Sequence, residues 1–266
     1  MIDPLEGPPQ PKEPTKGGGS AAVWQVLRSL GQRPNATITD IAAEIGLHKS
    51  SVSRLLGGLR EDGIVEWDDE TSRYRLGLGL LALAAPLLAQ ADIIDAAGAE
   101  LVSLSESTGE SSSVMVWSGD GAVCVKQVIS PQPVKHSCSL GQRFNTAQSA
   151  SVQVFLAHTA PERVQRLLSD AVISGGQDRA TGEPCRSYLE RLAEVRARGW
   201  AVNASETSAQ ETSVAVPVRD SHGVCGAILV SAPSYRTPLA VVESHVRAAQ
   251  QAASVVSRRM GGCAEA

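Results

Sequence analysis

The sequence has no excess of positive charge, no long apolar run and few aromatic side chains. Its 266 residues carry 24 Lys and Arg against 28 Asp and Glu, a formal net charge of −4, and 3% are aromatic. A basic field over the whole molecule is therefore excluded, and any nucleic-acid binding must come from a local patch. The one long apolar stretch, Leu76 to Ala91, is too short and too rich in alanine, glycine and proline to span a bilayer.

Signals for export, metal binding and redox chemistry are also missing. The N-terminus lacks the basic start and apolar core of a signal peptide, so we expect a cytoplasmic protein with no membrane partner. The five cysteines are an odd number, and no two have the spacing of a zinc knuckle or redox pair. The five histidines form no metal-binding pair. The sequence predicts reduced thiols, no metal and no cofactor, although a site assembled from distant residues stays open.

Enzyme motifs are absent as well. The sequence contains no Gly-x-Ser-x-Gly, no phosphate-binding loop ending in Gly-Lys-Ser/Thr, and no Gly-x-Gly-x-x-Gly after a strand. Gly77-Leu78-Gly79 opens a helix, but it lacks the third glycine and the following acidic residue of a dinucleotide-binding motif. We expect no enzyme and assign no catalytic residue.

The first 80 residues change character at about Ser20. Residues 1–19 hold five prolines and four glycines, which predicts a flexible tail. After it, apolar residues recur at helical spacing, and Thr37 with Asp40 has the form of a capping box. The expected elements are a helix that ends at Gly31, a helix that Thr37 caps, a turn over 46–48, a helix over 49–61, and a hairpin with strands over 63–67 and 73–76. This order is typical of a winged helix-turn-helix.

The third of these helices carries residues suited to DNA. In a helix-turn-helix the second helix of the unit enters the major groove, with base contacts near its N-terminus. With its apolar residues buried, this helix presents cations and hydroxyls that reach bases or phosphates. Thr39 on the preceding helix adds a hydroxyl, and arginines at the helix end and on the wing are candidates for phosphate contacts. The predicted DNA-binding residues are Thr39, Lys49, Ser50, Ser51, Ser53, Arg54, Arg60, Arg73 and Arg75.

The charge of this region is locally, not globally, favourable. Residues 20–79 carry seven Lys and Arg but eight Asp and Glu. From Leu47 to Arg60, however, there are four potentially positive groups and no acid, while the acids concentrate over 61–70 at the wing. The acidic wing tip should avoid phosphates. Because winged helices also mediate protein contacts, a protein-interaction role stays open on these observations alone.

The second half of the chain predicts a mainly antiparallel sheet flanked by helices. Turns at 118–121 and 220–223 separate strand candidates, as expected for hairpins. Strands are expected over 112–118, 122–129, 134–138, 201–205, 213–219 and 224–231. Helices are expected over 78–91, 96–106, 150–158, 161–168, 184–198 and 239–260. The fold class is therefore α+β, with a second domain of sensor type.

Several motifs resemble those of one family, the IclR-type bacterial transcriptional regulators. The run from Ile41 to Leu56 is similar to the recognition segment of that family, and Arg73 to Gly77 continues the likeness. Further similar segments are Ser107-Thr108-Gly109-Glu110, which ends an "L-x-x-L-x-x-x-T-G-E" helix, Ile129 to Pro133, Arg198 to Val202, and Val214 to Asp220. The resemblance covers nearly everything after Ser20.

This resemblance implies a regulator, a repressor rather than an activator, that binds double-stranded DNA at a pseudo-palindromic operator. It implies a GAF-like effector-binding domain, and assembly as a homodimer or as a homotetramer formed from two dimers. The dimer seam would lie on the linker helix, at Leu80, Leu81, Leu83, Leu87 and Leu88. The expected organisation is a disordered tail over 1–19, the winged helix-turn-helix over 20–77, the linker and dimerisation helix over 78–92, and the GAF-like domain over 93–262.

The expected effector pocket departs from the pattern of the family. The "H-A-T-A-x-G-K" loop reads Ala147 to Gln153 here and loses its glycine and lysine. A common cysteine is replaced by Ser213 and an acid by Asn203, and a serine-x-serine keeps only Ser231, with Leu229 in the other place. The predicted effector-binding residues are Ala150, Ser151, Asn203, Ser213, Leu229 and Ser231. We expect a pocket less polar than those for small acids, for a ligand larger or more apolar than a short organic acid. A domain that only oligomerises and binds no ligand is the alternative.

Overall fold

The computed structural model describes residues 19–89, 92–178 and 181–262. Its contacts divide the chain into two compact units with the boundary after residue 90, and each is described here by itself. The expected tail lies outside the described residues except for Gly19, which begins the first helix. The linker expected over 78–92 corresponds to a helix over Gly79–Ala89, and the next helix already begins at Asp92.

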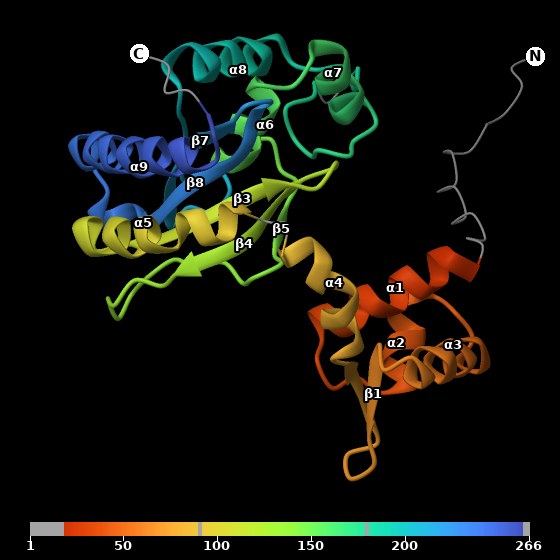
Figure 1. The fold of residues 1–266 in the computed structure, drawn as a ribbon. Coiled ribbons are helices and arrows are strands. Elements are labelled where there is room, and N and C mark those ends of the chain that lie inside the picture. The colour runs from red at the N-terminus through yellow and green to blue at the C-terminus, as the bar shows by residue number, and fades with distance from the viewer. Residues whose placement is uncertain (1–18, 90–91, 179–180, 263–266) are drawn as a thin grey trace, which may run out of the picture. The chain divides into compact units, whose positions relative to one another are not determined.

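The first unit is a winged helix-turn-helix (Figure 1). Val26, Ile41 and Leu56, one from each of its first three helices, are fully buried and build its core. Gly77 follows the hairpin, and a Cβ there would overlap the carbonyl oxygen of Gly63, so only glycine lets the two backbones approach. The elements are α1 (Gly19–Gln32), α2 (Ile38–Ile45), α3 (Lys49–Glu61), the antiparallel pair β1 (Val65–Asp68) and β2 (Arg73–Leu76), and α4 (Gly79–Ala89).

Local sequence fixes the turn between α2 and α3. The Thr37 hydroxyl accepts from the Asp40 amide at 3.2 Å while the Asp40 carboxylate accepts from the Thr37 amide at 3.0 Å, so the predicted capping box is present. Gly46 ends α2 in the left-handed conformation with φ of 69°, which glycine adopts without strain. His48 then caps α3. These caps orient α3 relative to α2.

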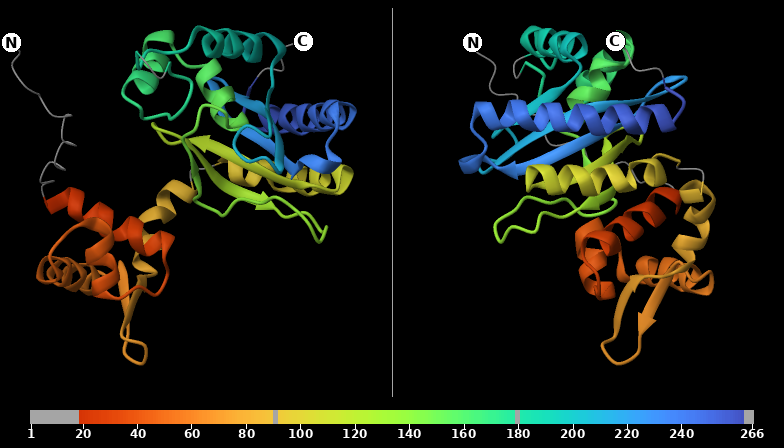
Figure 2. Two further views of the ribbon diagram at one scale, coloured as in Figure 1. Left: turned by 180° about the vertical axis from the view of Figure 1, so that it is seen from behind. Right: turned by 60° about the vertical axis from the view of Figure 1, so that its left-hand side comes forward.

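The second unit is built on one six-stranded antiparallel sheet with the order β5-β4-β3-β8-β7-β6 (Figure 2). Its strands are β3 (Ser111–Trp117), β4 (Ala122–Val128), β5 (Arg143–Phe144), β6 (Ala201–Ala204), β7 (Glu211–Asp220) and β8 (Gly223–Pro233). Its helices are α5 (Asp92–Thr108), α6 (Ala150–Ala157), α7 (Pro161–Ser169), α8 (Arg186–Arg198) and α9 (Leu239–Arg259), with a 3₁₀ turn, η1 (Ser234–Arg236), before α9. This architecture confirms the α+β class.

Helices cover both faces of this sheet, so the unit has two cores. On one face α5 and α9 pack over residues such as Ile228 and Val230 of β8. On the opposite face α6 packs over Ala227 and Leu229 of the same strand, and α8 packs against α6. Because successive side chains of a strand point to opposite faces, β8 serves both cores.

The prediction of a strand over Val134–Cys138 is wrong. The free edge of β4 pairs instead with the two residues of β5, at Ala122 with Phe144 and Val123 with Arg143. Segment 134–138 therefore has no strand to pair with, although its burial alternates at His136 and Cys138. It forms an irregular loop.

The described cysteines Cys124, Cys138, Cys185 and Cys225 are free thiols, and Cys263 lies outside the described residues. Among the described helices, none has the length and apolar character needed to cross a membrane.

Candidate DNA interface and effector cavity

Helix α3 presents a polar face opposite its buried side. Val52 and Leu56 are fully buried in the core of the first unit. The side chains of Lys49, Ser50, Ser53, Arg54 and Arg60 are exposed, Ser51 is half-buried, and Thr39 is exposed on α2. Nδ1 of His48 lies 2.8 Å from the Ser50 hydroxyl, so the N-terminus of α3 is ordered by its own side chains. The face therefore has the composition expected of a recognition helix.

The cationic side chains of α3 form no ion pairs with described acidic residues of the unit. Lys49, Arg54 and Arg60 make no ion pair or side-chain hydrogen bond with any described residue. On the wing, by contrast, Arg75 pairs with Glu66 at 2.8 Å and Arg73 donates to the carbonyl of Asn35 at 2.8 Å. Because exposed ion pairs are weak, a phosphate could displace Glu66 from Arg75. Helix α3 thus presents three cations without an acidic partner among the described residues.

The wing tip carries fixed negative charge. Hydrogen bonds from Thr71, and a further one from the amide of Glu70, lower the pKa of the Asp68 carboxyl. The indole of Trp67 donates to Asp69 at 2.9 Å, which holds a second carboxylate at the same turn. A tip that stays anionic is repelled by phosphates.

A cavity of about 300 Å³ lies in the second unit. Four of the predicted effector-binding residues line it: Asn203 of β6, Ser213 of β7, and Leu229 and Ser231 of β8. Their proximity follows from strand register, since Asn203 pairs with Ser213 and Ser213 pairs with Ser231. These three residues form a row across adjacent strands, and Leu229 lies two residues from Ser231 on the same face.

The other two predicted residues do not line the cavity. Ala150 and Ser151 are buried at the start of α6, and Ser149, which precedes them, lines it instead. The Ser149 and Ser151 hydroxyls lie 3.2 Å apart, so Ser151 contacts a lining residue without lining the cavity itself. The position of the family lysine, Gln153, is fully buried, and its Nε2 donates to the carbonyl of Gln148 at 2.9 Å.

Sequence reasoning missed the loops that complete the wall. Together with β5 and the first residue of β7, they contribute the remaining lining residues, His136, Ser137, Cys138, Gln142, Arg143, Phe144, Asn145, Thr146, Thr207, Ser208 and Glu211. Nothing in the local sequence marks these loops as ligand-facing, because only the strand order brings β5 and the loop before it to this position.

The cavity offers more hydrogen-bonding groups than free charge. The Arg143 guanidinium forms an ion pair with Asp120 and donates to the Ser118 hydroxyl at 3.2 Å. Oδ1 of Asn203 accepts the amide of Glu206 at 2.9 Å, so part of its amide group holds the adjacent turn. The lining residues mainly carry hydroxyls and amides, together with the carboxylate of Glu211 and the imidazole of His136, and Phe144 and Leu229 are apolar. Such a wall suits a small molecule bound by hydrogen bonds around a compact frame.

The chain combines a helix-turn-helix, whose recognition helix is cationic, with a sensor-type sheet that holds a cavity. This combination defines a ligand-responsive transcriptional regulator. The model of the IclR helix-turn-helix domain matches residues 23–69, and that of the bacterial transcriptional regulator IclR C-terminal domain matches residues 85–258. The chain belongs to the IclR family, which confirms the resemblance noted in the sequence.

Relatives extend over most of the chain. It is 30% identical over 247 residues to the glycerol operon regulatory protein of Streptomyces griseus, which covers 91% of this chain and 94% of that relative. A crystallised domain of an IclR-family regulator is 42% identical, with a TM-score of 0.61, and covers 66% of this chain and 100% of that one. The fold also matches an IclR homologue from Microbacterium hydrocarbonoxydans crystallised with 4-hydroxybenzoate, at 21% identity and a TM-score of 0.73, over 91% of this chain and 98% of that one.

Proposed function

We propose that the protein is a cytoplasmic repressor whose affinity for its operator is set by a small molecule in the cavity of the second unit. The observation that carries the proposal is the exposed face of α3, where Lys49 and Arg54 have no acidic partner among the described residues. The chain acts through binding, and we assign it no catalytic step. Repression follows if the operator overlaps the promoter, where the bound protein excludes polymerase.

Each side chain of the DNA interface has a proposed role. Lys49 and Arg54 contact guanine edges or phosphates, and Ser50 and Ser53 contact bases or phosphates beside them. Ser51 and Thr39 add hydroxyl contacts from the base of α3 and from α2. Arg60, Arg73 and Arg75 hold the phosphate backbone.

We further propose that two copies pair through α4, as a dimer or a dimer of dimers. Leu81 and Leu83 on this helix are 58% and 68% exposed, a large apolar surface for a single chain to leave in water. Leu80 packs against the core of the first unit, while the side chains of Leu87 and Leu88 lie outside the description. A two-fold dimer matches a pseudo-palindromic operator. Sedimentation equilibrium of Leu81→Glu against the unaltered chain tests this pairing.

The effector is proposed to be a small molecule with hydroxyl or carboxyl groups on a compact frame. A volume of 300 Å³ equals about ten liquid waters, which leaves room for a ligand larger than a short organic acid. The names of two relatives suggest probes, glycerol and 4-hydroxybenzoate. Calorimetric titration with both and with a set of two- and three-carbon acids tests the expectation. If only the short acids bind, the expectation of a larger or less polar ligand is wrong.

The proposal is tested first by gel shift of the full chain with the DNA upstream of its own gene, at two salt concentrations and with competitor DNA. We expect a specific shift that weakens as salt rises, because cations on α3 release counterions from the phosphates. Deleting the gene should raise transcription from that promoter. If neither this DNA nor a genome-wide selection yields a site, the winged helix is an interaction module instead.

A further inference from the structure

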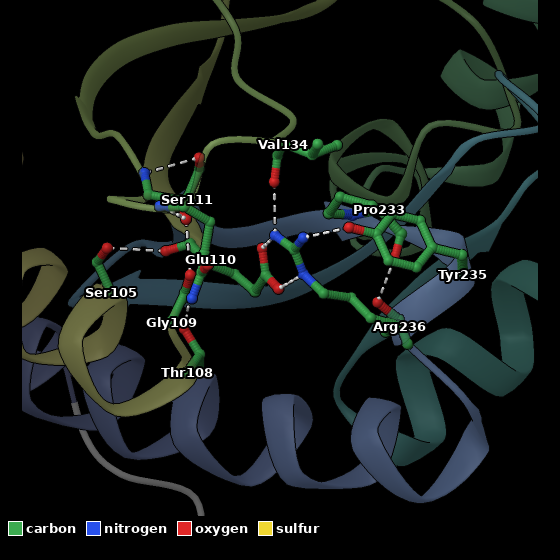
Figure 3. A network of polar contacts seen from close by, with 12 residues as sticks. Ser105, Thr108, Gly109, Glu110, Ser111, Val134, Pro233, Tyr235 and Arg236 are labelled. Carbon is green, nitrogen blue, oxygen red and sulfur yellow. Dashed lines mark hydrogen bonds and ion pairs between the residues drawn. The ribbon is translucent and has the colours of Figure 1, made fainter.

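Glu110 and Arg236 form an ion pair next to the wall of the cavity (Figure 3). Glu110 follows α5 and is 5% exposed, and Arg236 ends η1. Nε of Arg236 donates to Oε1 of Glu110 at 2.5 Å, and Nη2 donates to Oε2 at 2.8 Å. This two-point geometry fixes the plane of the guanidinium, which a flexible lysine could not reproduce.

The same guanidinium holds the loop between β4 and β5. Its Nη2 donates to the backbone carbonyl of Val134 at 2.9 Å, and its Nη1 donates to the Tyr235 hydroxyl at 2.8 Å (Figure 3). The start of this loop is attached to the residue before Glu110, because the Ser130 hydroxyl donates to the Gly109 carbonyl at 2.6 Å. The loop thus has two anchors, at residue 130 on Gly109 and at residue 134 on Arg236, and the ion pair with Glu110 connects the two.

Directly after these anchors the loop becomes the wall of the cavity. His136 and Cys138 line it, two and four residues after Val134. The Gln127 side chain of β4 holds Cys138 itself, because its amide nitrogen donates to the Cys138 carbonyl at 2.6 Å and its amide oxygen accepts from the Cys138 backbone amide at 2.9 Å. On the sheet side, Ser111 follows Glu110 and pairs in register with Ser231, which lines the cavity. The ion pair therefore joins the loop side of the wall to the strand side.

We propose that Glu110 and Arg236 are positioning residues for the effector cavity, which hold segment 130–138 closed as one of its walls. Arg236 acts through Val134, and Glu110 acts by fixing the plane of Arg236. Loss of the pair should open this wall while the sheet and both cores remain folded. The inference rests on the proposed function only where it names the cavity as the effector site.

The experiment measures how fast iodoacetamide alkylates Cys138 in the full-length native chain, read peptide by peptide by mass spectrometry. Cys138 reports on this loop because its thiol is half-buried in the wall of the cavity, so opening of the wall exposes the sulfur to the reagent. In Arg236→Gln we expect the rate at Cys138 to rise roughly tenfold, the factor that corresponds to about 1.4 kcal/mol. Hydrogen exchange over 129–138 should accelerate with it.

Arg259 provides a matched control. It also pairs with a carboxylate, Glu100, at 2.9 Å and donates to a backbone carbonyl, that of Ala96, at 2.7 Å. These contacts join α9 to α5 and do not include the loop. Arg259→Gln should leave the Cys138 rate within twofold of the unaltered chain, and Cys185 and Cys225 should keep their rates in both variants.

Arg236→Lys separates positioning from simple stabilisation. An ammonium can pair with Glu110, so thermal stability should largely recover, but Val134 loses its fixed donor and the rate at Cys138 should stay raised. If Arg236→Gln speeds all cysteines equally, the pair only stabilises the fold and the inference is overturned. An unchanged rate at Cys138 overturns it too. Neither result bears on DNA binding, which the gel shift decides separately.

Discussion

The proposed DNA interface can be tested at the guanidinium of Arg54. It is exposed on α3 and makes no contact with a described acid. Replacing it by alanine should weaken operator binding by roughly 1–3 kcal/mol if it contacts a guanine. Fluorescence anisotropy with operator and scrambled duplexes measures this loss. Arg28→Ala, on α1, removes the same charge from outside the helix-turn-helix pair and is the control, and equal affinities in both variants would rule out a role for Arg54.

Ser213 is the central residue of the row across β6, β7 and β8. It is 4% exposed and lines the cavity. In Ser213→Val a methyl group replaces the hydroxyl and another is added, while the strand keeps a residue with high β propensity. We expect effector affinity to fall at least roughly tenfold, because a polar group of the ligand loses its partner. Calorimetry measures the loss, and operator binding without ligand should not change. Full retention of effector affinity would place the ligand elsewhere.

Among the elements, α2 depends on its capping box. Hydrogen bonds from the Thr37 side chain and backbone lower the pKa of the Asp40 carboxyl below its ordinary value. A lowered pKa stabilises the folded state above the ordinary carboxyl pKa of about 4, and this stability is lost as the pH falls below it. At pH 7 the first unit of the unaltered chain should therefore melt at a higher temperature than that of Asp40→Asn, and this difference should shrink as the pH falls below about 4. Circular dichroism melts of both chains over a series of pH values from 7 downward measure this, and a difference that stays constant would contradict it.

Elements with a regular pattern could be predicted from the sequence, and loops could not. The helices around Gly46 and the strand that carries Leu229 and Ser231 follow from local spacing, because caps and alternation act within a few residues. The alternation at 134–138 predicts a strand, but a strand also needs a partner, and β5 occupies the edge of β4. The row of Asn203, Ser213 and Ser231 was found through the resemblance to the motifs of the family and not from spacing, whereas the lining loops around His136, which no such motif marks, were missed.

At the scale of the whole molecule, the two units have separate cores. Leu56 is fully buried in the first and Leu101 in the second, and no buried residue belongs to both clusters. Calorimetry should show two transitions, with Leu56→Ala lowering one and Leu101→Ala the other, each by about 2–5 kcal/mol. Each variant is the control for the other, since each leaves the core of the other unit intact. A common shift in either variant would mean that the units unfold together.

The alternation along β8 has a consequence for how this regulator can change over time. Ile228 and Val230 face α5 and α9, whereas Leu229 and Ser231 face the side of the cavity. With the cavity as the proposed effector site, mutations at odd positions alter which small molecule fits, while even positions continue to anchor the helices that hold the domain together. Descendants of this chain could then change their effector by a few substitutions on one side of a strand, without first passing through an unfolded ancestor.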